Sequence, residues 1–300
     1  MIDWAPWRMG CEELQHLWYP ACNPLTSYTA AEGGAPTPGR AHLDQVSLWQ
    51  FQGSHFCEKA RWALDFKNIP HTRRNLGGSY LVRAWWRTGR ANLPILVTGK
   101  RAVGGSSAII AETEKIAPSP ALYPRELAER ERALGLESYF DAQLGHQVRT
   151  AALLSPLLHE PVFVARFAGM GLRPSAQRTF VAVAPLFARF YRWRHGIQAS
   201  GEAAARANVA QVLDRLWSEL GGRDHLVGDT FSVADLTASA LLGSLLGAPE
   251  VTYPMPEPLP HSVVRYRKEL LVHPASRWVL ETYRRHRGSS AEVAVHEAAV

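Results

Sequence analysis

Residues 45–76 read QVSLWQFQGSHFCEKARWALDFKNIPHTRRNL, and this stretch decides the fold of the first half of the chain. It begins with a short apolar run closed by a glycine, which is typical of a buried strand and predicts one over 45–51. From Ser54 onward apolar residues recur every three or four positions, so we expect a helix whose first turn is capped by the Ser54 hydroxyl. Asn68-Ile69-Pro70 ends this helix, and residues 71–76 can form a second strand. The stretch therefore predicts a β-α-β unit.

The segment that follows completes a small α/β domain. An irregular helix is expected over 79–87, and Leu93-Pro94-Ile95-Leu96-Val97 has the composition of a strand that begins at a proline. Thr98-Gly99-Lys100 is a tight turn into a further strand at 101–103, so these two strands should form a hairpin. A helix over 106–117 closes the unit. We predict a thioredoxin-like α/β domain at 45–117.

Pro118-Ser119-Pro120 marks a domain boundary, because the chain beyond it has helical periodicity and little strand signal. We expect an all-helical domain at 118–287, followed by a tail at 288–300. Residues 1–44 show no sustained periodicity and are expected to be a poorly ordered extension. The expected helices of the second domain are 124–150, 159–169, 174–196, 202–220, 232–246 and 262–286.

The bulk composition limits the partners. Hydrophobic residues make up 46% and charged residues 20% of the 300-residue chain, which is ordinary for a globular protein and sufficient for two cores. The net charge of +6 could suit a nucleic acid, but arginines are spread among acidic neighbours in stretches such as 125–132. We therefore expect no nucleic-acid partner.

Cysteine usage and hydropathy indicate the compartment. Cys11, Cys22 and Cys57 have neither metal-ligand spacing nor the pattern of a disulfide framework, so we expect a reducing compartment and no metal. No stretch approaches the ~20 apolar residues that a membrane span needs, and the N-terminus lacks a signal-peptide pattern. The prediction is a cytoplasmic protein without a membrane partner.

Three motifs stand out along the chain. They are Ser54-His55-Phe56-Cys57-Glu58-Lys59-Ala60-Arg61-Trp62-Ala63-Leu64; Leu93-Pro94-Ile95-Leu96 followed by Ser106-Ser107-Ala108-Ile109; and Leu226-Val227-Gly228-Asp229-Thr230-Phe231-Ser232-Val233-Ala234-Asp235. In the third motif, Asp235 is expected to reach back to the start of a helix at Ser232. Together the motifs resemble those of the glutathione transferase superfamily, over about residues 45–287. Members of that family combine a thioredoxin-like domain with an all-helical domain, and the third motif resembles the capped helix in the core of the helical domain.

The resemblance implies catalytic roles for Ser54 and Cys57. A hydroxyl at a helix N-terminus can stabilise the glutathione thiolate by a hydrogen bond and by the helix dipole, and Ser54 occupies that position. The alternative for Ser54 is a helix cap alone. Cys57 lacks the partner of a Cys-x-x-Cys pair, although an acidified thiol could still form mixed disulfides. The alternative for Cys57 is a small buried core residue.

The resemblance also implies the glutathione-binding residues. Pro94 should be a cis-proline, and the backbone of Leu93 should pair with the cysteinyl part of glutathione. Ser106 and Ser107 start the helix that would hold the γ-glutamyl carboxylate, although Ser106 could equally be a helix cap. Many family members have an acidic or amide residue just before this serine, whereas this chain has Gly104-Gly105.

We therefore expect a glutathione transferase-like protein in which Ser54 activates the thiol of bound glutathione for attack on a small hydrophobic electrophile. Glutathione is the co-substrate and no metal takes part. Two alternatives remain open: a non-catalytic binding module that keeps the fold, and a glutathione-dependent thiol reductase that uses Cys57. The resemblance also implies a homodimer.

Overall fold

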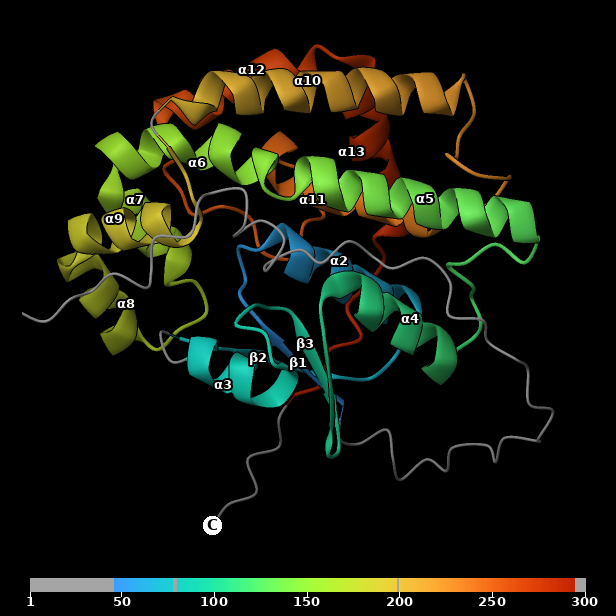
Figure 1. Ribbon diagram of the computed structural model, residues 1–300, viewed down its shortest axis with the longest axis horizontal. Coiled ribbons are helices and arrows are strands. Elements are labelled where there is room, and N and C mark those ends of the chain that lie inside the picture. Colours follow the sequence, from blue (N-terminus) through green and yellow to red (C-terminus); the bar gives the residue numbers. More distant parts are fainter. Residues whose placement is uncertain (1–45, 78–79, 199, 295–300) are drawn as a thin grey trace, which may run out of the picture. The chain divides into compact units, whose positions relative to one another are not determined.

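The computed structural model describes residues 46–77, 80–198 and 200–294. The expected N-terminal extension at 1–44 lies outside these residues. Figure 1 shows the α/β region with its sheet and the helices of the second region. Among the described residues, no helix is long and apolar enough to cross a membrane.

The α/β region contains a four-stranded sheet in the order β2-β1-β3-β4 (Figure 1). Strand β1 is parallel to β2, whereas β3 is antiparallel to both β1 and β4. Leu48 in β1 lies opposite Leu96 in β3, and Trp49 lies opposite Ile95. This topology confirms the predicted β-α-β unit and hairpin. The strands are β1 (Val46–Gln50), β2 (Thr72–Asn75), β3 (Ile95–Thr98) and β4 (Arg101–Gly104).

Three helices belong to this region: α2 (His55–Phe66), α3 (Tyr80–Thr88) and α4 (Ser106–Ile116). Helix α2 packs against α4 on one side and against helix α11 (Val233–Leu246) on the other. Buried Leu48 and Leu96 from the sheet meet Leu64 of α2 and Ile109 of α4 in one apolar cluster. Burial of these side chains fixes α2 and α4 on the sheet and thereby positions their N-termini.

The second region is helical, as expected, and together with the α/β region it confirms the predicted fold class. The expected single helices at 124–150, 174–196 and 262–286 are wrong, because the chain breaks each of these stretches between two helices. Pro185 and Pro274 lie in the first turn of the second helix of their pairs, a position that tolerates proline. The remaining helices are α5 (Leu127–Leu144), α6 (Gln147–His159), α7 (Pro161–Ala168), α8 (Pro174–Ala182), α9 (Ala184–Arg194), α10 (Gly201–Leu220), α12 (His261–Leu271) and α13 (Pro274–His286).

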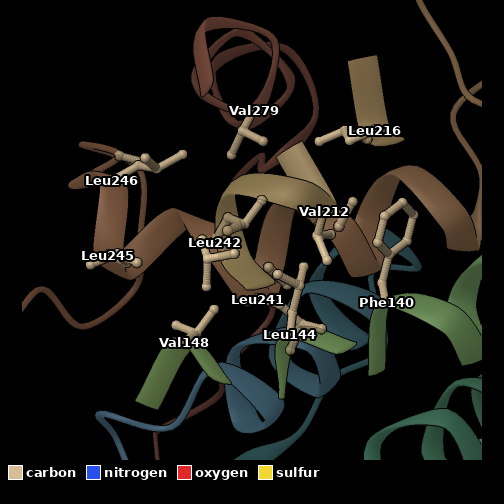
Figure 2. Close-up of a cluster of buried hydrophobic side chains, with 14 of the residues drawn as sticks. Phe140, Leu144, Val148, Val212, Leu216, Leu241, Leu242, Leu245, Leu246 and Val279 are labelled. Carbon is tan, nitrogen blue, oxygen red and sulfur yellow. The ribbon is translucent and has the colours of Figure 1, made fainter. Parts of the chain in front are cut away.

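Helix α11 runs through the core of the helical region and is buried on nearly all sides. Figure 2 shows Leu241 and Leu242 of α11 among apolar side chains of α5, α10 and α13. At its start, the Asp235 carboxylate accepts hydrogen bonds from the Ser232 N–H at 2.9 Å and the Ser232 hydroxyl at 2.8 Å. It also accepts the Leu226 N–H at 2.8 Å. The predicted reach of Asp235 back to the helix start is confirmed.

The chain after α13 returns to the α/β region. The His71 N–H donates to the Ala291 carbonyl at 3.3 Å, and the Val293 N–H donates to the His71 carbonyl at 2.9 Å. The Ala291 N–H donates to the Asp65 carboxylate at 2.8 Å. Residues 291–293 therefore pair beside the start of β2, with a parallel bridge between His71 and Glu292.

Candidate functional site

Ser54 lies at the N-cap of α2 with φ −84° and ψ 124°, and it is partly exposed. Its hydroxyl oxygen accepts a hydrogen bond from the Cys57 N–H at 3.3 Å, so the predicted cap is present. A hydroxyl that accepts one bond can still donate its own proton. That proton points to the Cys57 sulfur, because a side-chain hydrogen bond from Ser54 acts to lower the pKa of the Cys57 thiol. The Ser54 hydroxyl therefore acts as a cap and as a donor, and a ligand sulfur would have to take this hydrogen bond over from the buried Cys57 sulfur.

Cys57 lies one turn into α2 and is fully buried. Its sulfur accepts the Phe51 N–H at 3.5 Å. Burial raises the pKa of the Cys57 thiol, and the nearby charge of Arg61 opposes this effect without reversing it. A buried and protonated thiol is a poor nucleophile. The geometry favours the interpretation of Cys57 as a core residue over that of a reactive group.

The Leu93–Pro94 peptide bond is cis, and Pro94 is buried just before β3. The Pro94 carbonyl accepts the Gly105 N–H at 3.0 Å. The antiparallel pairing of β1 with β3 ends at Trp49 and Ile95, two residues after Leu93 in the chain. No backbone partner of Leu93 is found in the described ranges. Its N–H and C=O groups therefore form an open edge near the start of α2.

Ser106 is the first residue of α4 and is 5% exposed, and the N-cap position belongs to Gly105. The expectation that Ser106 could be the cap is therefore wrong. Gly105 has φ +94°, a conformation that residues with a side chain rarely adopt. A Cβ atom at Gly104 would lie 3.2 Å from the Thr88 side chain. The positive φ thus explains the glycine at 105, and the Thr88 side chain leaves little room for a side chain at 104.

Ser107 points into a buried ion cluster that joins three helices. Its hydroxyl donates to the Asp141 carboxylate at 2.7 Å and accepts from the Lys59 ammonium at 3.0 Å. Lys59, which is fully buried, also lies 2.7 Å from Asp141 and 2.8 Å from Glu137. Of the two serines, Ser106 is thus the one placed at the helix start, while Ser107 ties α4 to α2 and α5.

A second group of polar side chains lies near the start of α2, and the sequence did not predict it. The His55 imidazole bonds to the Gly145 carbonyl at 2.9 Å, four residues before Arg149 of α6. Arg149 reaches the His195 Nδ1 at 3.1 Å, and the His195 ring packs on Tyr191 with 4.4 Å between centroids. No carboxylate pairs with Arg149 within the ranges that the structure describes.

Arg149 sets the charge of this group. Burial and then the Arg149 charge lower the pKa of His55 to about 3 and that of His195 to about 2, so both rings are neutral at pH 7. Burial raises the pKa of Tyr80 while the charges of Arg194 and Arg149 oppose it, which leaves a protonated hydroxyl. Arg149 therefore provides positive charge near the start of α2, in a group that includes the protonated Tyr80 hydroxyl. The sequence could not predict this group, because its members meet only where α9 packs on α6.

The fold and this site define a class of protein: a thioredoxin-like domain with an open cis-proline edge and a serine at a helix N-terminus, joined to a helical domain. Residues 48–121 match the glutathione S-transferase N-terminal domain, and residues 180–274 match the glutathione S-transferase C-terminal domain. The chain belongs to the glutathione transferase superfamily.

Solved structures share this fold at low sequence identity. The beta-etherase LigF from Sphingobium sp. strain SYK-6 is 17% identical with a TM-score of 0.51, over 79% of this chain and 98% of its own. A glutathione S-transferase from Rhodospirillum rubrum F11 is 18% identical with a TM-score of 0.47, over 78% and 91%. A Methylobacterium radiotolerans glutathione S-transferase, solved with glutathione sulfonate, is 20% identical with a TM-score of 0.48, over 85% and 99%. None of the curated protein sequences matches this chain.

Proposed function

We propose that this protein binds glutathione along the Leu93–Pro94 edge and activates its thiol through Ser54 for attack on a small hydrophobic electrophile. The observation that carries the proposal is the Ser54 hydroxyl, which caps α2 and is partly exposed at the helix N-terminus. A hydrogen bond from this hydroxyl to the glutathione sulfur favours the thiolate over the thiol.

The positive end of α2 adds to this effect. The unpaired N–H groups of a helix N-terminus favour a negative charge placed beside them, by about 0.3–1 kcal/mol at an exposed site. The Arg149 charge acts on His55, the residue directly after Ser54, so it also favours an anion in this region. A thiolate held here would attack an electrophile bound alongside it, with proximity lowering the barrier.

The rest of the tripeptide would lie on backbone groups. The open N–H and C=O groups of Leu93 suit the main chain of the cysteinyl residue. The start of α4 at Gly105 and Ser106 suits the γ-glutamyl carboxylate, because the first N–H groups of a helix lack partners within it. Since Gly104 and Gly105 provide no side chain for the ligand's amine, the affinity should be lower by the loss of one charge-assisted bond, about 1.5–3 kcal/mol.

Two alternatives differ in their test results. A binding module would take glutathione without turnover, and the two glycines before Ser106 favour that outcome. A thiol reductase would need an accessible Cys57 thiolate, and the burial of Cys57 speaks against it. We further propose a cytoplasmic homodimer, as in the family, with glutathione and the electrophile as its small-molecule ligands.

The test combines binding and turnover. Calorimetric titration with glutathione should show binding, and conjugation to 1-chloro-2,4-dinitrobenzene should be measurable. Ser54→Ala should lower kcat about 100-fold, the typical loss for one donor to a developing anion. Ser54→Thr, which keeps a hydroxyl and a cap, should retain most of the activity. Ser175→Ala, at an exposed serine of α8, is the matched control and should be unchanged.

Either of two results would contradict the proposal. The first is the absence of heat at millimolar glutathione, which removes both enzyme interpretations. The second is glutathione binding with full activity in Ser54→Ala, which excludes the role of the hydroxyl. Activity lost in Cys57→Ala but kept in Ser54→Ala would instead identify a reductase.

A further inference from the structure

Helix α3 presents large apolar side chains to solvent. Val82 is 69% exposed, Trp85 60% and Trp86 82%, and Ala84 is the buried residue of this helix. Positions 82, 85 and 86 are spaced three and four residues apart, so they lie on one face of the helix. Figure 1 shows α3 at the left of the α/β region, beside the sheet. Such an apolar face on a surface helix indicates an interaction site.

Arginines accompany this apolar face. Arg83, Arg87 and Arg90 are exposed, and the Arg87 guanidinium lies 5.6 Å from the ring centroid of Trp49 in β1. From residue 66 to residue 111 the chain contains no aspartate or glutamate. The expectation that arginines are spread among acidic neighbours is therefore wrong for this stretch. We call Val82, Arg83, Trp85, Trp86, Arg87 and Arg90 the α3 face.

Helix α9 repeats the combination. Leu186 is 70% exposed, Phe190 43% and Trp193 75%, and residues 161–201 also lack acidic side chains. The end of α9 is fixed to the segment after α3, because the Arg194 guanidinium donates to the Ala91 carbonyl at 3.1 Å. Two segments of the chain that are joined by a hydrogen bond thus carry exposed aromatic rings and arginines and contain no acidic residue.

We propose that the α3 face is a peripheral contact surface for an anionic lipid bilayer. A helix with an apolar row that includes tryptophan beside a basic row is suited to lie in the headgroup region, with its rings inserted and its arginines on anionic headgroups. Such a contact needs no spanning segment, so it is compatible with the helices described above. The exposed Val82 side chain adds apolar surface that lipid can bury. An aliphatic side chain cannot stack on a base, so it does not favour a single-stranded nucleic acid as the partner. A second copy of the chain that docked through the same face would bring two sets of these arginines together across a two-fold axis. Like-charge repulsion disfavours that arrangement.

The test is co-sedimentation of the full chain with vesicles. Vesicles of equal parts phosphatidylglycerol and phosphatidylcholine should pellet the protein, pure phosphatidylcholine vesicles should not, and added salt should weaken the binding. Trp85→Ser/Trp86→Ser should lower the partition coefficient at least tenfold. Arg83→Gln/Arg90→Gln should lower it about 25-fold, since one basic residue at an anionic surface contributes about fivefold.

Controls keep the result specific. Trp217→Ser is the matched control, because Trp217 is 46% exposed on α10 near acidic Asp214 and Glu219, and it should bind like the unchanged protein. Circular dichroism and the thermal midpoint should not change in any variant, because these side chains point outward. Absence of binding to the anionic vesicles would overturn the proposal, as would equal binding by Trp85→Ser/Trp86→Ser. Binding to a single-stranded RNA oligonucleotide, or self-association, that these substitutions abolish while vesicle binding persists would also overturn it.

Discussion

Arg287, at the end of α13, holds a buried charge network that links the C-terminal segment to α2. It is 3% exposed, and its guanidinium lies 2.8 Å from Glu58 and 3.0 Å from Asp65. The same guanidinium donates to the Thr252 hydroxyl. Replacing Arg287 with methionine keeps an apolar stem but leaves two buried carboxylates with one cation fewer. We expect this substitution to destabilise the fold strongly.

The magnitude follows from what remains after the substitution. Breaking a buried ion pair costs about 3–5 kcal/mol. Glu58 would keep Arg61 at 2.8 Å, and Asp65 would keep Arg73 at 2.8 Å. The free energy of unfolding at pH 7 should therefore fall by about 3 kcal/mol, the lower end of that range.

The effect should depend on pH. Burial alone would raise the pKa of Glu58, but Arg61 and Arg287 hold it at about 2 in the folded protein, against 4.5 for an ordinary glutamate. A depressed folded pKa stabilises the protein above pH 4.5, and this stabilisation is lost as pH falls from 4.5 toward 2. Removal of Arg287 raises the pKa of Glu58. The gap, which is the difference in unfolding free energy between the unchanged protein and Arg287→Met, should therefore narrow at low pH, by up to about 1.4 kcal/mol per unit of pKa.

Urea denaturation followed by circular dichroism at pH 7, 5, 4 and 3 measures this gap. Arg284→Met is the matched control: Arg284 lies on the same helix but pairs with Glu281 at the surface, so its unfolding midpoint should not change. A gap that is the same at pH 7 and pH 3, or below about 1 kcal/mol at pH 7, would refute the reasoning about Arg287.

Two further predictions concern the candidate site. In a variant with Cys11 and Cys22 replaced by serine, the Cys57 thiol should react with Ellman's reagent only as fast as the protein unfolds, because it is buried; rapid labelling of the native protein would contradict its assignment to the core. Gly105→Ala should lower stability by about 1–3 kcal/mol through its φ of +94° and ψ of 138° alone, since no atom lies within 4 Å of the added Cβ. Gly135→Ala, within α5 and equally free of contacts, should instead raise stability by about 0.4–1 kcal/mol in the same thermal melts; equal shifts for both would disprove a backbone cause.

The sequence by itself determined the features that depend on near neighbours. The apolar run before Ser54, the proline at the hairpin and the Ser232–Asp235 cap are each read within a few residues, because strand, turn and cap preferences are local. The β-α-β unit, the hairpin and the cap are confirmed for this reason. The Ser54 cap was likewise predictable, since it needs only the N–H three residues later.

Tertiary structure alone decided which charged groups meet. Lys59 pairs with Asp141, and Glu58 with Arg287, across long stretches of chain. Arg149 meets His195 only because α9 packs on α6. Periodicity shows which side of a helix is apolar, but it does not show which distant charge will be buried against it. The energies of these pairs depend on distance and on exclusion of water, and both arise only when the helices pack.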